Sequence, residues 1–444
     1  MKTIKSKILV LETLRCFVKK KKSNVIHFRP SSVERSTFNF FCGSHSLVYV
    51  DSYKYLGIWF SEHVTWNKAV KELSKSASRA LSCLTVKFYA YGGMTYQVFT
   101  KLYESLVQPI LLYGASIWGN TEHRLINNVQ NRASKIFLGV TKLTSNTAVQ
   151  GDLGWLSCHA KQRLEVLRFF YKLETRTHTR TFYKIHLWSK RKRRSWNFNV
   201  IKLFRNMSVE HLMQPGISKE LFFKVVKSKL RILELLIPTC IMIVSAQETM
   251  STCPKASPIV FELSMSLLIH FGVVSSVKSP DCASEVTLPL WFTKLWNDNS
   301  NVNGNKLRLY RRYKKDLQPE HYVTNAMPRH LRSNLCKLRC GTLPLSVETG
   351  RYTKPPIPLE ERICPFCNDA VEDEIHFLIN CDIYSDLRFN LFHRAMVMDN
   401  SFCTKSDFNQ FVFLIQNAEL QYELSILVHN MIRRRRALKS NLHS

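Results

Sequence analysis

The sequence predicts a mainly α-helical protein with a small β region near the N-terminus and a metal-binding module near the C-terminus. Three patterns support this fold class. Apolar and polar residues alternate in residues 25–60, apolar residues recur every three or four positions from residue 64 to about 175, and residues 364–381 gather three cysteines and a histidine. Alternation is typical of strands, the longer spacing of amphipathic helices, and clustered cysteine and histidine of zinc sites.

The composition is that of a folded, strongly basic protein. The 444 residues are 45% hydrophobic, which is enough for the cores of two or three domains. The 64 lysines and arginines exceed the 33 aspartates and glutamates by 31, and basic blocks stand at residues 19–22, 190–194 and 433–436. This balance favours a polyanionic partner, RNA or DNA, and the same blocks are typical of nuclear import signals.

Cysteine usage and apolar stretches bear on the compartment. The thirteen cysteines are mostly scattered singly and no long apolar core follows the basic N-terminal residues, so we expect a reducing intracellular compartment, with the nucleus favoured. The apolar residues 235–244 are too few to span a bilayer, and residues 259–274 carry Glu262 and His270, which are costly at its centre. We therefore expect no membrane partner.

The N-terminal elements can be assigned in order. Residues 25–60 should form short strands and hairpins, with turns at residues 30–32 and 43–44. From Val64 the spacing predicts a long helix with one apolar and one cationic face. The apolar face holds Trp66, Val70, Leu73, Ala77, Leu81 and Leu84, and the cationic face holds Lys68, Lys71, Lys75 and Arg79.

Three further amphipathic helices are predicted before residue 175. The first contains YQVFTKLYESLVQ, and Pro109 should end or kink it because proline lacks an amide donor and clashes with the preceding turn. The other two contain LINNVQNRASKIFLGV and HAKQRLEVLRFFYKLE. Their inward residues should be Leu125, Val129, Ala133, Ile136 and Phe137 in the former and Leu164, Leu167 and Tyr171 in the latter.

The second half is less regular. Residues 200–290 show no sustained period, so no element is assigned to them. Beyond them, KLRLYRRYKKDL interleaves aromatic and basic residues, and the C-terminal LQYELSILVHNMIRRRRALKS has helical spacing. Cys336 and Cys340, four positions apart, are expected to be ordinary buried thiols.

Residues 364–381 have the spacing C-x2-C-x8-H-x4-C, supplied by Cys364, Cys367, His376 and Cys381. Two cysteines separated by two residues can turn both sulfurs inward, and the later pair completes a tetrahedron suited to Zn²⁺. All four positions come from protein, so the metal is expected to be structural and not catalytic. Four acidic residues between the ligands should be solvated or orient the imidazole: Asp369, Glu372, Asp373 and Glu374.

Four segments together carry a resemblance to a known family. They are SYKYLGIWF, LYESLVQPILLYGASIWGN, MPRHLRSNLCKLRCGTLPLSVETGRY and CPFCNDAVEDEIHFLINCDIYSDLR. In this order they resemble the C-terminal half of the second open reading frame of non-LTR (LINE-type, jockey/RTE-like) retrotransposons, which encodes an endonuclease and a reverse transcriptase. The likeness covers about residues 22–190 and 290–395.

The resemblance implies a role for each segment. Tyr55, Leu56 and Gly57 look like the Tyr-Leu-Gly element near the primer-gripping hairpin, the following helices look like the thumb, and the Cys-Cys-His-Cys cluster looks like a nucleic-acid-binding knuckle. The implied division is residues 1–60, a palm-end β-hairpin remnant; 61–195, a helical thumb-like domain; 196–290, an irregular region or insert; 291–350, a basic-aromatic helical connector; 351–395, the zinc module; and 396–444, a helical basic tail.

The catalytic centre of that family has no counterpart here. Reverse transcriptases hold two Mg²⁺ ions on paired aspartates, which the family carries just upstream of the segment that KKKKSNVIHFRP resembles. This sequence contains no Asp-Asp pair, and residues 1–18 do not resemble the palm. We therefore expect no catalytic residues, no Mg²⁺ site and no polymerase or endonuclease activity from this chain.

The leading interpretation is a truncated, retrotransposon-derived protein that binds RNA or DNA without polymerising it. Cations should contact phosphates, and tyrosine rings should stack on bases. The residues expected to do so are Lys68, Lys71, Lys75, Arg308, Arg311, Arg312, Tyr310 and Tyr313. Two other interpretations stay open: a partial gene model of an active reverse transcriptase, and a non-enzymatic adaptor whose helices and zinc module bind a protein.

Overall fold

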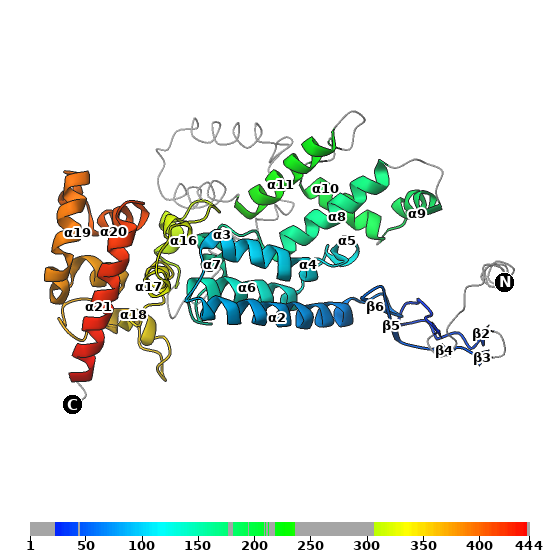
Figure 1. Ribbon diagram of the computed structural model, residues 1–444, viewed down its shortest axis with the longest axis horizontal. Coiled ribbons are helices and arrows are strands. Elements are labelled where there is room, and N and C mark those ends of the chain that lie inside the picture. Colours follow the sequence, from blue (N-terminus) through cyan, green and yellow to red (C-terminus); the bar gives the residue numbers. More distant parts are fainter. Residues whose placement is uncertain are drawn as a thin grey trace, which may run out of the picture. The chain divides into compact units, whose positions relative to one another are not determined.

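Helices make up most of the described chain, which confirms the mainly α fold class (Figure 1). The computed structural model describes residues 23–42, 45–175, 181–193, 195–207, 209, 212, 218–235 and 306–441. The chain forms two compact units, Met1–Ser76 and Ala77–Ser444, whose boundary falls within helix α2. The expectations for residues 1–22, with their basic block at 19–22, for the turn at residues 43–44 and for residues 236–305 lie outside the described residues.

The described part of the first unit contains short strands that pair two by two, as the alternating pattern predicts. The parallel pair is β1 (Asn24–Val25) with β4 (Val48–Tyr49). The antiparallel pairs are β2 (Phe41–Cys42) with β3 (His45–Ser46), and β5 (Ser52–Tyr55) with β6 (Ile58–Ser61). In the longest pair Tyr53 lies opposite Phe60, so aromatic side chains face each other across the two strands.

The Tyr-Leu-Gly element forms the turn between β5 and β6. Leu56 and Gly57 are its two loop residues, with φ angles of 46° and 86°. Two successive positive φ angles define the tight hairpin turn whose twist matches that of the flanking strands. Leu56 is 74% exposed and Tyr55 is 59% exposed, so the tip presents apolar side chains to solvent.

The long helix predicted from residue 64 is α2 (Asn67–Ala90). Its predicted apolar face is confirmed, because Val70, Leu73, Ala77, Leu81 and Leu84 are all buried. Trp66 precedes the helix and is half-buried, with its ring 5.9 Å from that of Phe60.

The helix around Pro109 continues through the proline with a changed winding. α3 (Tyr96–Leu102) passes into the π-helical η2 (Tyr103–Val107) and then into α4 (Gln108–Leu111). The amide of Gln108 donates to the carbonyl of Tyr103, five residues back. This wider turn accommodates a residue that has no amide donor, so the predicted disturbance takes the form of a π-bulge.

The remaining helices before residue 236 begin and end at recognisable caps. Ser157 accepts from the amide of Ala160 at the start of α8, and Gly154, with φ 64°, ends α7. These helices are α5 (Ala115–Trp118), α6 (Arg124–Leu138), α7 (Asn146–Leu153), α8 (Cys158–Glu174), α9 (Thr181–Lys190), α10 (Trp196–Asn206) and α11 (Lys219–Leu235).

One detail of the predicted helix faces is wrong. Leu125 is 47% exposed, and its neighbour Ile126 takes the buried position. Val129, Ala133 and Phe137 are buried as predicted. Because 3.6 residues make one turn, a face chosen by spacing alone can be placed one residue out of phase at a helix end.

Residues 196–206 and 219–235 form the helices α10 and α11, although the sequence pattern assigns no element to residues 200–290. α10 and α11 pack with α8 around a core that contains Phe170, Phe204 and Phe222. Tyr171 is half-buried, with its ring 4.4 Å from that of Phe222. The irregular region of residues 196–290 is therefore helical in its first part.

The C-terminal part of the second unit consists of short helices followed by longer ones. They are α15 (Tyr310–Tyr313), α16 (His321–Thr324), α17 (Arg329–Arg339), α18 (Ser346–Thr349), η4 (Leu359–Glu361), η5 (His376–Asn380), η6 (Asp382–Tyr384), α19 (Ser385–Met398), η7 (Phe402–Thr404), α20 (Asp407–Gln416) and α21 (Gln421–Asn441). Within the described residues, no helix has the combined length and apolar character needed to cross a bilayer.

A buried network around Asp152 joins the early helices to this C-terminal part. The Asp152 carboxylate accepts from the Tyr310 hydroxyl at 3.0 Å and from the Tyr322 hydroxyl at 2.5 Å. The Arg339 guanidinium donates to both Asp152 oxygens at 3.1 Å. A buried charge is tolerated only when it is paired and hydrogen-bonded, and this network satisfies the Asp152 carboxylate fully.

Candidate metal centre

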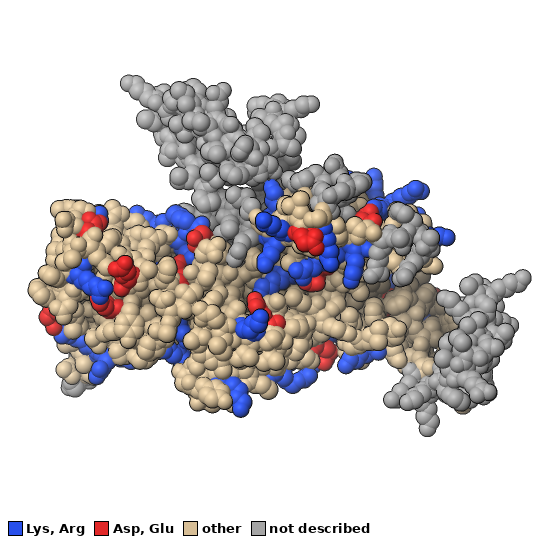
Figure 2. All heavy atoms as spheres, turned by 45° about the horizontal axis from the view of Figure 1, so that its top comes forward, with Lys and Arg blue, Asp and Glu red and all other residues tan. Residues whose placement is uncertain are grey.

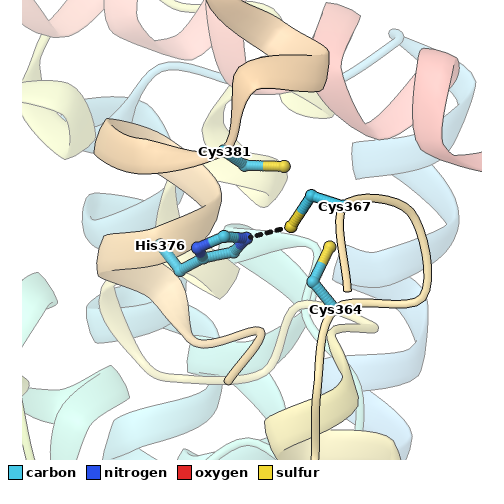
Figure 3. Close-up of side chains that lie close together, drawn as sticks. All are labelled: Cys364, Cys367, His376 and Cys381. Atoms are coloured by element: carbon cyan, nitrogen blue, oxygen red, sulfur yellow. Dashed lines mark hydrogen bonds between the residues drawn. The ribbon is translucent and has the colours of Figure 1, made fainter. Parts of the chain in front are cut away.

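The structure brings together the four residues that the spacing selects. The ligand atoms of Cys364, Cys367, His376 and Cys381 all lie within 4.8 Å of one another, and their side chains point toward a common centre (Figure 3). Cys367 Sγ lies 3.3 Å from His376 Nε2. Three sulfurs and one imidazole nitrogen at such separations could hold one metal ion.

The first two ligands come from a tight loop. The Cys364 amide donates to the carbonyl of Ala370, and the Asn368 amide donates back to the carbonyl of Cys364 at 3.0 Å. Asn368 has a φ angle of 56°, a conformation that asparagine adopts more readily than most residues. The loop thereby reverses direction and turns both sulfurs inward.

The other two ligands bracket the π-helical turn η5. Asp373 Oδ1 accepts from the amides of Ile375 and His376, which fixes the start of the turn. The Cys381 amide donates to the His376 carbonyl at 2.8 Å, five residues back. The wider π turn sets the spacing at which the His376 ring and the Cys381 sulfur reach the same point.

Burial makes this cluster unfavourable for free thiolates. Cys364 and Cys381 are each 1% exposed. Burial raises the pKa of the Cys364 thiol and raises the pKa of the Cys381 thiol to about 12. Only thiolates bind a metal, so the positive charge of a bound cation would be needed to stabilise them in this site.

Two acidic residues between the ligands are buried, which corrects the expectation that they are solvated. Glu374 is 3% exposed and pairs with Arg308. Glu372 is 1% exposed, and its carboxylate accepts from Ser346 and from both Nε and Nη2 of Arg435 at 2.7 Å. Asp373 caps η5, and Asp369 is exposed.

Arg435 is a supporting residue that sequence reasoning missed. It belongs to the basic block at residues 433–436, which suggests a solvated tail, yet it is 5% exposed. Its guanidinium also lies over the Phe366 ring, 5.4 Å from the centroid. Helix α21 is thereby tied to the loop between Cys364 and Cys367. The apolar residues three and four positions before Arg435 are the sequence signal that places it on the inner face.

A second cluster of possible ligands is poorly suited to a metal ion. Asp152, Cys336 and Cys340 lie close together and are buried. The Asp152 oxygens already accept from two tyrosines and from Arg339, whose charge would repel a cation. Cys336 and Cys340 have their sulfurs 3.9 Å apart and are the ordinary buried thiols that the sequence predicts.

The residues predicted to bind nucleic acid fall into two groups. Lys68, Lys71 and Lys75 are exposed on α2. Lys68 Nζ lies 3.8 Å from the centroid of the Trp59 ring, and Lys75 Nζ lies 2.9 Å from Glu72.

The second group is largely enclosed. Tyr310 is 1% exposed and Tyr313 is 4% exposed, so the prediction that their rings stack on bases is wrong. Their hydroxyls are occupied within the core, since Tyr313 donates to the carbonyl of Arg339. Arg308 is half-buried and pairs with Glu374.

The two other arginines of that segment differ from each other. Arg312 is exposed, and its guanidinium carbon lies 3.6 Å from the centroid of the Phe408 ring. Arg311 is half-buried. The interleaved aromatic and basic residues of this segment therefore mainly pack α15 against the rest of the unit, and few of them are available at the surface.

Comparison with known proteins gives no match: no family model fits the chain, and no curated protein or solved structure is significantly similar to it.

Proposed function

We propose that this chain is a zinc-stabilised nucleic-acid-binding protein related to the C-terminal half of non-LTR retrotransposon reverse transcriptases. The observation that carries the proposal is the convergence of Cys364, Cys367, His376 and Cys381 in a strongly basic chain. The order of the four segments that resemble that family, and the exposed Tyr-Leu-Gly hairpin tip, support the same relationship.

Zinc is the metal that suits this donor set. Three thiolates and one imidazole form a closed tetrahedral site, which leaves no position for a water or a substrate. The role of the ion is then to hold the Cys364 loop against η5 and to stabilise the fold around them.

The charge distribution supports a polyanionic ligand. Several carboxylates form internal ion pairs. Each pair neutralises one positive and one negative charge, so the excess of 31 positive charges remains on the other residues. Figure 2 accordingly shows more Lys and Arg than Asp and Glu on the visible face. The internal pairs are Glu62–Arg29, Asp152–Arg339, Glu348–Lys306, Glu372–Arg435 and Glu374–Arg308.

The zinc assignment is tested by metal content. Purified protein should contain one zinc per chain by elemental analysis, and the Cys381→Ser variant should contain far less because one thiolate is lost. Cys403→Ser is the matched control, since Cys403 is an exposed free thiol outside the cluster. Equal zinc in both variants would overturn the assignment.

Nucleic-acid binding is tested by salt dependence. The affinity for a single-stranded RNA should fall steeply between about 50 and about 200 mM KCl, because bound phosphates release counterions. The triple variant Lys68→Gln, Lys71→Gln, Lys75→Gln should lower the slope of log affinity against log salt by about 2. No RNA binding, or binding that ignores salt, would contradict the proposal and favour a protein partner.

A further inference from the structure

A basic pocket lies between helices α17 and α21. It has a volume of about 260 Å³. This is several times the ≈30 Å³ that one water occupies in the liquid, so the pocket can admit a phosphate group. It is lined by Gly139, Arg329, His330, Ser333, Asn334, Lys337, His429, Ile432, Arg433 and Arg436.

The periodicity of both helices explains why these side chains meet. On α17, Arg329, Ser333 and Lys337 are four positions apart and share one face. On α21, His429, Arg433 and Arg436 are four and three positions apart, and they share the face of α21 that is turned toward α17. Each helix therefore contributes basic side chains to the same pocket.

The lining contains no acidic residue. Among the described residues, Arg329, Lys337, Arg433 and Arg436 form no ion pair with a carboxylate. Their neighbours in the same basic block behave differently, since Arg434 pairs with Asp386 and Arg435 pairs with Glu372. The block is thus divided between two paired arginines and two that line the pocket.

The positive charges that line the pocket repel one another. Burial, followed by the charges of Arg436 and Arg329, lowers the pKa of Lys337. Burial, His330 and the two pocket arginines of α21 lower the pKa of His429. The Arg329 Nε atom is enclosed without a hydrogen-bond partner. A bound anion would relieve this repulsion and offer an acceptor.

The polar side chains of the pocket are arranged to donate. The Asn334 amide nitrogen lies 3.0 Å from His429 Nδ1, so that ring nitrogen accepts and Nε2 carries the proton of the neutral ring. The His330 and His429 rings lie 4.9 Å apart. Because His330, Arg433 and Arg436 are exposed, the pocket opens to solvent and can be reached by a long polymer.

We propose that this pocket binds a backbone phosphate of a single-stranded nucleic acid, with Arg433 and Arg436 from α21 and Lys337 and Arg329 from α17 as its donors. The inference rests on the proposed nucleic-acid-binding function and assigns it a site made of residues other than the Cys-His cluster and the lysines of α2. Arginine pairs suit phosphate because the planar guanidinium donates two parallel hydrogen bonds.

The test compares two double variants of equal charge. Arg433→Gln with Arg436→Gln removes two pocket cations, and Lys101→Gln with Lys315→Gln removes two exposed cations that do not line the pocket. Each is titrated against a single-stranded RNA of about 20 nucleotides. The pocket variant should bind about tenfold more weakly and lose about 1.4 from the salt slope, as expected for two lost phosphate contacts. The control should change affinity less than about twofold.

The possible outcomes separate the two proposals. If the wild-type protein binds no RNA, both the function and the pocket assignment are overturned. If it binds RNA but the two double variants lose equal affinity, the function stands and the pocket assignment is overturned. Both variants should keep the wild-type zinc content, because the substituted side chains are exposed.

Inorganic phosphate distinguishes a free anion from a nucleic-acid backbone. Phosphate should raise the thermal midpoint of the wild type above that in KCl of equal ionic strength, and the pocket variant should lose this shift. A phosphate shift that depends on the pocket, together with RNA affinity that does not, would mean a site for a small anion and would overturn the proposal.

Discussion

At the scale of single residues, the adjacent Arg434 and Arg435 show how burial determines the contribution of an ion pair to stability. Arg435 and Glu372 are enclosed, with side-chain exposures of 6% and 1%. Arg434 and Asp386 form a similar pair at the surface, with exposures of 33% and 62%. Removing one partner of a buried pair leaves the other charge buried without compensation. Removing one partner of an exposed pair leaves a charge that water can solvate.

Glu372→Gln should therefore destabilise the zinc-loaded protein by about 3–5 kcal/mol. Urea unfolding at saturating zinc measures the loss. The matched control is Asp386→Asn, which removes the surface pair and should cost less than about 1 kcal/mol. Similar effects of the two substitutions would mean that the Glu372–Arg435 pair does not stabilise the fold.

Cys158 illustrates how burial controls thiol chemistry. It is 1% exposed, and burial raises its pKa to about 12, so only ~10⁻⁴ of it is thiolate at pH 8. In the native protein at pH 8, Cys83 and Cys403 should be alkylated by iodoacetamide within minutes, while Cys158 should stay unmodified. Peptide mass spectrometry checks each site, and early labelling of Cys158 would contradict its enclosure.

At the scale of elements, helix α7 depends on a glycine where two segments approach closely. Gly154 ends α7 with φ 64°, and a Cβ placed there would lie 2.5 Å from the nitrogen of Pro319. Gly92 has a similar φ of 67°, but a Cβ there would meet nothing within 4 Å. Both positions require a positive φ, but only at Gly154 would a Cβ atom clash with a neighbouring segment.

Gly92→Ala should cost about 1 kcal/mol, because an alanine adopts a positive φ reluctantly. Gly154→Ala should cost about 1–3 kcal/mol more, because overpacking forces the backbone near Pro319 to move. Chemical denaturation of both variants checks the difference. Equal losses would mean that the Pro319 segment can yield without strain.

At the scale of the whole molecule, the Cys-His cluster and the C-terminal helix α21 should be energetically coupled once the cluster binds a metal. Glu372 lies between the ligands Cys367 and His376 and holds Arg435 of α21. Loss of a structural metal frees the loop that carries Glu372, so the contact that fixes α21 weakens.

Chelation of zinc should therefore accelerate amide hydrogen exchange in α21 by at least about tenfold, since one lost anchoring interaction of ~1.4 kcal/mol has this effect on a local opening equilibrium. Helix α6 serves as the internal control, because its Phe137 packs against Phe99 of α3, outside the cluster. Unchanged exchange in α21 would show that the helix is held independently of the metal.

The sequence alone determined the mainly helical class, the inward face of α2 and the four residues that converge in the Cys-His cluster. These features depend on local spacing, which is visible in one dimension. Tertiary structure decided the rest. It placed Tyr310 and Tyr313 in the core and enclosed Glu372 with Arg435.

It also joined two faces of α17 and α21 into one basic pocket. Whether a polar side chain meets solvent or a buried partner depends on segments distant in the chain, so spacing along a single helix cannot reveal it.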